Sequence, residues 1–187
     1  MNDDKREKAG KTAVDGFIVV ERIYRHAYQT LMALKDELKT EYNLKAESPM
    51  YTNPKSDADP KSWLYYFRGI YLAEKKISLE EYRKKEVTIL FLQASLYNVN
   101  RGEPLLRFGV IEKIFNMSTW KGIRFDDYVR MILAELHTEP KPGAIKASHC
   151  EGVVKFDEKP LLDIRDDNYV TDLAGEIGEK YARLLFR

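Results

Sequence analysis

The sequence has little cysteine, no long apolar run and almost no net charge. Cys150 is the single cysteine among 187 residues, which excludes an internal disulfide and a zinc site built from cysteine pairs. The first twelve residues are charged, and no apolar run approaches the roughly 20 residues that a membrane-spanning helix needs. We therefore expect a cytoplasmic protein with no membrane partner, and no motif indicates a cofactor.

The composition is that of a globular protein. Hydrophobic residues make up 44% of the chain and charged residues 33%, which is ordinary for a folded domain and unlike a disordered segment. A chain of this length fits one domain with a sizeable core. We expect a flexible charged tail at 1–12 and one globular domain at 13–187.

Charge is unevenly distributed although the net charge is only +1. Residues 61–125 carry 12 Lys/Arg against 6 Asp/Glu and hold 12 of the 22 aromatic residues, whereas 126–187 carry 9 Lys/Arg against 13 Asp/Glu. This asymmetry indicates an anionic partner, or simply a strand-rich segment whose charges meet opposite charges on folding.

Residues 14–44 are predicted to form one long amphipathic helix. Apolar residues recur there at alternating spacings of three and four, at Phe17, Val20, Tyr24, Ala27, Leu31, Leu34 and Leu38. Other apolar residues widen this stripe, which favours packing on a sheet. The same periodicity leaves open a second interpretation, in which two copies of the chain associate through the 14–44 helix.

The rest of the chain predicts a sheet and further helices. Proline, asparagine and aspartate predict a loop at 47–62. Strands are expected at 63–73, 87–97, 105–115, 144–157 and 161–164, and helices at 78–85, 125–136 and after the candidate caps Asp166, Asp167 and Asn168. The predicted fold class is α+β, with a mixed or antiparallel sheet of about 4–5 strands and the order αβββαβ(β)α.

Part of this order, αβββαβ, resembles the core of the PD-(D/E)XK nucleases. That resemblance implies metal-dependent phosphodiester cleavage by an acid on the second strand and an acid-x-Lys pair on the third. Here the second strand, 87–97, has no acid, and Glu112 on the third is followed directly by Lys113. Acid-x-Lys spacing occurs elsewhere, at Glu74 and Lys76 and at Asp157 and Lys159. The order matches, but the residues do not.

Three further residues, Glu112, His149 and Glu151, are candidates for chemistry. Glu112 falls on an apolar strand face, where it is either a catalytic acid with a raised pKa or a carboxylate with a bulge or a basic partner such as Arg124 beside it. His149 and Glu151 share one strand face and are candidate metal ligands. Cys150 points the other way and is predicted to be a buried apolar thiol.

The basic middle segment is the candidate for nucleic-acid binding. Arg107 and Lys113 lie on the face of the 105–115 strand opposite its apolar residues, where aromatic residues are available for base stacking. The full candidate set is Arg83, Lys84, Lys85, Arg101, Arg107 and Lys113. An overall pI of about 7.7 is low for a dedicated nucleic-acid-binding protein.

Because each catalytic arrangement fails on spacing or strand position, the sequence favours a non-enzymatic binding, accessory or regulatory domain. Its expected partner is a protein, including a second copy of the chain. The alternative is a nucleic-acid-binding or metal-dependent nuclease-like protein with a degenerate αβββαβ core.

Overall fold

A curved antiparallel sheet forms the centre of the protein, in a computed structural model that describes residues 3–46, 50–51, 67–74, 77, 87–96, 102–116, 125–147 and 150–186. The strand order is β1-β3-β4-β5-β7-β6, and β2 also pairs with β3. Each pairing is antiparallel. The strands are β1 (Lys45–Ala46), β2 (Met50–Tyr51), β3 (Phe67–Ala73), β4 (Val87–Ser95), β5 (Leu105–Asn116), β6 (Gly143–Ala147) and β7 (Cys150–Pro160).

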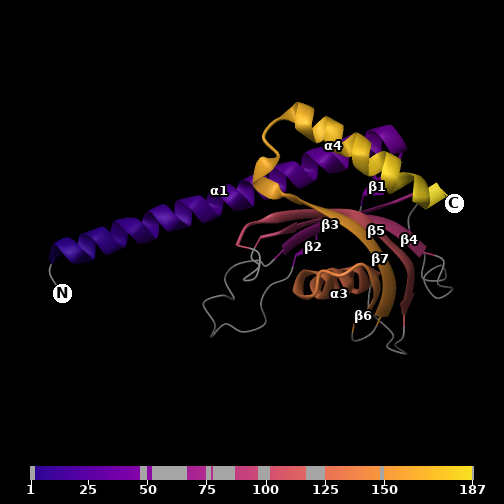
Figure 1. The fold of residues 1–187 in the computed structure, drawn as a ribbon, viewed down its shortest axis with the longest axis horizontal. Helices are drawn as coiled ribbons and strands as arrows, with labels where there is room; N and C mark the ends of the chain where they lie inside the picture. Colours follow the sequence, from indigo (N-terminus) through magenta and orange to yellow (C-terminus); the bar gives the residue numbers. More distant parts are fainter. Residues whose placement is uncertain are drawn as a thin grey trace.

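Helices cover both faces of this sheet (Figure 1). The helix α3 (Phe125–Thr138) lies in the concave face, while α1 (Asp3–Tyr42) and α4 (Asp167–Lys180) lie across the other face. Two short 3-10 helices, η2 (Leu161–Asp163) and η3 (Ala182–Phe186), flank α4. The predicted α+β class and its order of elements are confirmed.

The two faces of the sheet have separate apolar cores because successive strand residues point to opposite sides. On β4, Leu90 and Leu92 pack toward α1 and α4, whereas Ile89 and Phe91 pack toward α3. All of them are 0% exposed. This explains why 87–95 is a nearly continuous apolar run: the central strands are covered on both sides.

The first helix is longer than the sequence predicted. It begins at Asp3, so most of the expected tail at 1–12 is helical, and it ends at Tyr42. Asn43 follows with a φ of 51°, the left-handed conformation that commonly ends a helix. Ala27, Leu31, Leu34 and Leu38 are buried, as their spacing predicted. Phe17, on the same seam, is 71% exposed because the helix has left the sheet at that point.

The strand β5 differs from the expectation of one apolar and one polar face. Arg107 faces the α3 side, which is buried as completely as the other side. A bulge then interrupts the alternation: Lys113 has a φ of 54°, and the pairing with β7 shifts register between Glu112 and Phe115. As a result Ile114 packs on the α3 side, whereas Val110, before the bulge, packs on the opposite side with α1 and α4.

The C-terminal region confirms one prediction and corrects another. Asp166 caps α4, its side chain accepting a hydrogen bond from the Tyr169 backbone N–H at 2.8 Å. The expected strand at 161–164 is wrong: Leu161 begins the 3-10 helix η2. Pro160 precedes it and has no N–H for a strand ladder, and the Leu161 N–H donates instead to the Pro104 carbonyl.

Other expected elements lie outside the described residues. These are the helix at 78–85, the start of the 63–73 strand and most of the 47–62 loop, within which only β2 is described.

Candidate functional site

The six predicted nucleic-acid-binding residues do not form a surface among the described residues. Arg107 is 0% exposed, so its guanidinium lies inside the protein. Lys113 is exposed at the β5 bulge. The others lie outside the described residues: Arg83, Lys84, Lys85 and Arg101.

Glu112 has a basic partner on the neighbouring strand. Its carboxylate lies 2.8 Å from Lys155 Nζ, and its side chain is 23% exposed. The sequence predicted either a bulge beside Glu112 or a basic partner such as Arg124. The bulge is present, the partner on the neighbouring strand is Lys155, and Arg124 lies outside the described residues. Of the two candidate metal ligands, Glu151 is half-buried on β7 and His149 lies outside the described residues. Where side chains are described, no three His, Cys, Asp or Glu gather as a metal site.

The acid-x-Lys pair at Asp157 and Lys159 connects β7 to α4. Asp157 accepts hydrogen bonds from Lys180 Nζ at 2.5 Å and from the Tyr181 hydroxyl at 3.0 Å. Lys159 donates to Glu176 at 2.6 Å, and this hydrogen bond raises the pKa of Lys159. Burial, then the hydrogen bond to Asp157, raises the pKa of Tyr181. The pair therefore holds a helix on the sheet.

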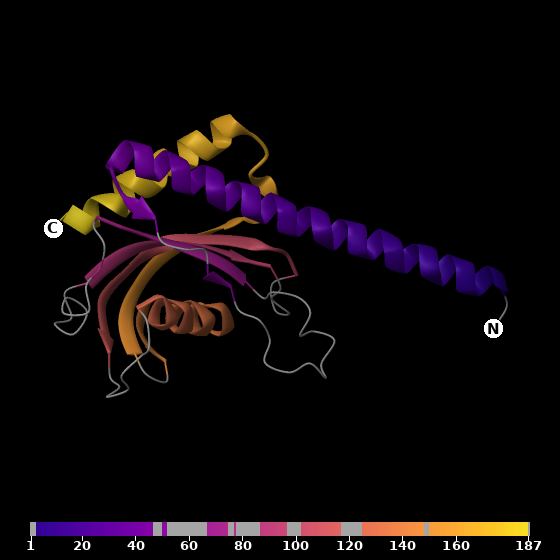
Figure 2. The same ribbon diagram turned by 180° about the vertical axis from the view of Figure 1, so that it is seen from behind.

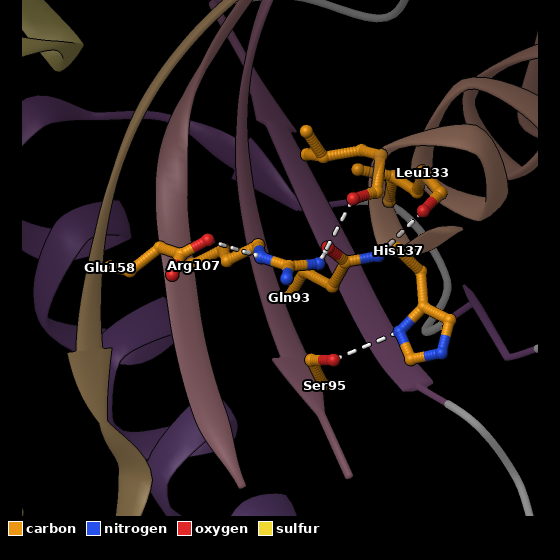
Figure 3. Close-up of polar contacts among 7 residues, drawn as sticks. Gln93, Ser95, Arg107, Leu133, His137 and Glu158 are labelled. Carbon is orange, nitrogen blue, oxygen red and sulfur yellow. Dashed lines mark hydrogen bonds and ion pairs between the residues drawn. The ribbon is translucent and has the colours of Figure 1, made fainter. Parts of the chain in front are cut away.

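A buried polar cluster lies between the sheet and the end of α3; it comprises Gln93, Ser95, Arg107, His137 and Glu158 (Figure 3). The Arg107 guanidinium donates through Nε to Glu158 at 2.9 Å and through Nη1 to the Leu136 carbonyl at 3.1 Å. Its Nη1 also lies 3.4 Å from the Gln93 side-chain oxygen. The cluster thus contains a fully buried cation and its carboxylate partner.

The chemistry of this cluster is that of a helix cap built from the sheet. The last carbonyls of α3 have no partner within the helix and carry its partial negative charge. Leu136 carries one of these carbonyls, and Arg107 brings a full positive charge to it; Gln93 donates to the Leu133 carbonyl, about one turn earlier, at 2.7 Å. Glu158, 17% exposed, balances that charge. We interpret the cluster as the anchor of α3 in the concave face.

Ser95 and His137 belong to the same anchor. The Ser95 hydroxyl lies 2.9 Å from His137 Nδ1, and the imidazole lies against the Phe67 ring with centroids 5.9 Å apart. A hydroxyl beside an imidazole is also the arrangement of nucleophilic catalysis. Here Ser95 is 0% exposed, so the hydroxyl is closed to a substrate in this structure. The bond ties the last turn of α3 to β4.

Cys150 is the buried thiol that the sequence predicted. It is 0% exposed, and its Sγ lies 3.5 Å from the Tyr128 carbonyl on α3. Burial, with a smaller contribution from Glu135, raises the pKa of the thiol to about 12. A thiol with so high a pKa is unreactive at neutral pH.

An exposed apolar surface lies elsewhere, on the N-terminal part of α1. Residues 3–19, which we call the arm, extend beyond the sheet, and both views show this part of the helix clear of the other elements (Figures 1 and 2). Every described side chain from 7 to 19 is exposed. Four large apolar side chains are among them: Val14 at 57%, Phe17 at 71%, Ile18 at 40% and Val19 at 53%.

The arm is poorly suited to form a helix in water without a partner. Gly10 and Gly16 each disfavour a helix by about 1 kcal/mol relative to alanine, and the β-branched residues at 14, 18 and 19 disfavour it further. Most helix stability in proteins comes from packing of an apolar face, and the described side chains of the arm have no such packing within the chain. Contiguous exposed apolar side chains are also typical of an interaction surface.

No protein-family model matches the chain, and no curated protein or solved structure shows significant similarity to it. Function is therefore inferred from the geometry of the chain itself. In the part of the chain that the structure describes, no helix has both the length and the apolar character that a membrane span requires.

Proposed function

We infer that the protein is a non-enzymatic binding domain in which the arm is the interaction element. The helix-covered sheet, which we call the body, is its support. One observation carries this proposal: Phe17, Val14 and Val19 are more than half exposed on a helix that extends beyond the body of the protein.

The body supplies what a binding element needs, which is a fixed base. Leu31, Leu34 and Leu38 are buried against the sheet and α4, so the second half of α1 cannot rotate or slide without opening the core. The arm continues the same helix. Its direction is thereby set by the body, while its side chains remain available to a partner.

The nucleic-acid alternative remains a prediction with less support. Lys113 is the one member of the candidate set that is described with an exposed side chain, and Arg107 is committed to the anchor of α3. The carboxylate of Glu112 pairs with Lys155. These positions add no observation in favour of phosphate binding or of phosphodiester cleavage.

A photo-crosslinking residue tests the proposed function whatever the identity of the partner. It is introduced in place of Phe17 on the arm and, as the matched control, in place of Leu162, which is 48% exposed on the body. We expect irradiation of cells that produce the full chain to give protein adducts from position 17 and few from position 162. Equal yields from both positions, or no adduct from the arm, would contradict the proposal.

A further inference from the structure

A second stripe runs along α1 on a side of the helix that the sheet does not touch. Its residues are spaced by four, three, four, three and four, so they fall on one line along the helix. All of them have exposed side chains. We call this set the arm stripe; it consists of Glu7, Lys11, Val14, Ile18, Glu21 and Arg25.

The arm stripe faces solvent even where α1 lies on the body. With 3.6 residues per turn, it is rotated by about 130° from the seam that includes Leu31, Leu34 and Leu38. Glu21 and Arg25, at its body end, have side chains that are 65% and 67% exposed. A partner on this stripe would therefore meet neither the sheet nor the core of its own support.

The order of charged and apolar side chains along the arm stripe is complementary to its own reverse. From its N-terminal end the stripe reads negative, positive, apolar, apolar, negative, positive. Turning a second copy around at the level of Gly16 places Val14 opposite Ile18. The same alignment places Lys11 opposite Glu21 and Glu7 opposite Arg25, and the two-fold axis repeats each pair.

Resting on the proposed function of the arm, we propose that its partner is a second copy of this chain, bound antiparallel along the arm stripe with the two-fold axis at the level of Gly16. The centre of the contact is apolar, with Val14 and Ile18 from both copies and Phe17 beside them. Opposite charges close both ends.

The body end of the stripe is shallowly hollowed between side chains of α1 itself. A hollow of about 330 Å³ lies along α1 there, lined by Ile18, Glu21, Arg22, Arg25, His26 and Gln29. Three of these are members of the arm stripe. In the antiparallel alignment, the Glu7 and Lys11 side chains of the second copy come to this hollow.

The charges already present in the hollow favour that arrangement. Arg25 and Glu21 form an ion pair at 2.5 Å on neighbouring turns. With Glu7 of the second copy beside Arg25 and its Lys11 beside Glu21, four charges alternate in sign. Networks of this kind contribute more than isolated exposed pairs. Parallel pairing in register would instead place each charged residue beside the same residue of the second copy, so that like charges would face each other.

Two neighbouring substitutions test the position of the contact. Ile18→Lys puts a charge in the apolar centre, whereas Val19→Lys puts the same charge on another side of the helix at similar exposure. By analytical ultracentrifugation of the full chain, we expect a concentration-dependent dimer for wild type and for Val19→Lys. Ile18→Lys should be monomeric. A monomeric wild type, or equal effects of both substitutions, would overturn the proposal.

Charge exchange tests the antiparallel direction. Lys11→Glu alone sets two carboxylates against each other at each end of the contact, and Glu21→Lys alone sets two ammonium groups against each other. Each variant should therefore dimerise about tenfold more weakly or worse. A mixture of the two variants restores opposite charges, and a heterodimer of wild-type affinity is expected. A mixture that associates no better than its components would overturn the antiparallel alignment. Circular dichroism of each variant confirms that the fold is retained.

The outcomes separate this inference from the proposed function. If the wild type stays monomeric while a crosslinker at position 17 captures a different protein, the arm is an interaction element and self-pairing is wrong. If position 17 gives an adduct of twice the chain mass, both stand. If neither dimer nor adduct forms, both fall.

Discussion

The two halves of α1 have the same secondary structure and opposite surroundings. In the half that packs on the body, residues 20–42, four apolar side chains are 0–1% exposed against the sheet and α4: Ala27, Leu31, Leu34 and Leu38. We call this the body half. In the arm, no described side chain is buried, and Phe17 is 71% exposed. One continuous helix therefore passes from a region stabilised by packing to a region that lacks packing within the chain.

This difference shows which residues stabilise the fold and which are left for binding. Most helix stability in proteins comes from packing of an apolar face rather than from intrinsic propensity. The body half has leucines at the buried positions and needs no further partner. The arm combines two glycines with exposed valine, isoleucine and phenylalanine, so its helix depends on contacts that another molecule supplies. Substitutions in the two regions should accordingly differ in kind.

The largest effect is expected in the anchor of α3. Glu158→Leu leaves the Arg107 guanidinium buried without its carboxylate, and breaking a buried ion pair in this way costs about 3–5 kcal/mol. Chemical denaturation would measure the loss. Replacing both residues by apolar ones, as in Arg107→Met with Glu158→Leu, should recover part of the free energy of unfolding. If Glu158→Leu were as stable as wild type, the Arg107–Glu158 ion pair would contribute nothing to the free energy of unfolding.

A slightly smaller effect is expected in the body half of α1. Leu34→Ala removes a side chain that is 0% exposed and leaves a cavity between helix and sheet, at a cost of about 2–5 kcal/mol. The same denaturation experiment detects it as a lower midpoint with an unchanged slope. Full retention of stability would mean that this half of the helix is not part of the core.

The buried thiol predicts a pH dependence of the body. Burial raises the pKa of Cys150 from 9.0 to about 12, so the folded protein keeps a proton that the unfolded chain loses above pH 9. The free energy of unfolding should therefore fall from pH 9 toward pH 12, by about 2 kcal/mol near the middle of that window. Cys150→Ala should have a flatter profile. Parallel profiles for the two proteins would contradict this assignment.

The smallest effect on stability is expected in the arm. Phe17→Ala removes the largest exposed side chain of that segment, yet the free energy of unfolding of the monomer should change by less than about 0.5 kcal/mol. Denaturation at low protein concentration would measure this, with Leu34→Ala as the comparison. A loss as large as that of Leu34→Ala would mean that the arm packs on its own body and is not free for a partner.

Much of the fold could be predicted from periodicity. The burial of Leu31, Leu34 and Leu38, the strand at 87–95 and the cap at Asp166 all follow from local patterns. The start of α1 at Asp3 did not, because charged residues and Gly10 suggested a tail. Whether a helix continues past its last core contact depends on its neighbours in space, which spacing alone does not reveal.

The candidate sites were harder to predict, for a physical reason. Arg107 looked like a surface cation because alternation assigned it to a polar strand face, and the α3 layer that buries this face is distant in sequence. A signal was nevertheless present. Gln93 and Arg107 are isolated polar residues within apolar strands, and they are direct partners across the β4–β5 pair. Isolated polar residues on central strands commonly mark a buried hydrogen-bond network.

The central claim is that a second copy of the chain stabilises the arm. Hydrogen exchange at several protein concentrations tests it most directly, because it measures the protection of both halves of α1 in one sample. Amides around Leu31–Leu38 should be protected at every concentration, since the body stabilises them. Amides of residues 10–19 should exchange fast in dilute protein and become protected as the concentration rises. If the protection of the arm amides did not change with protein concentration, whether that protection is strong or weak, stabilisation of the arm by a second copy would be contradicted.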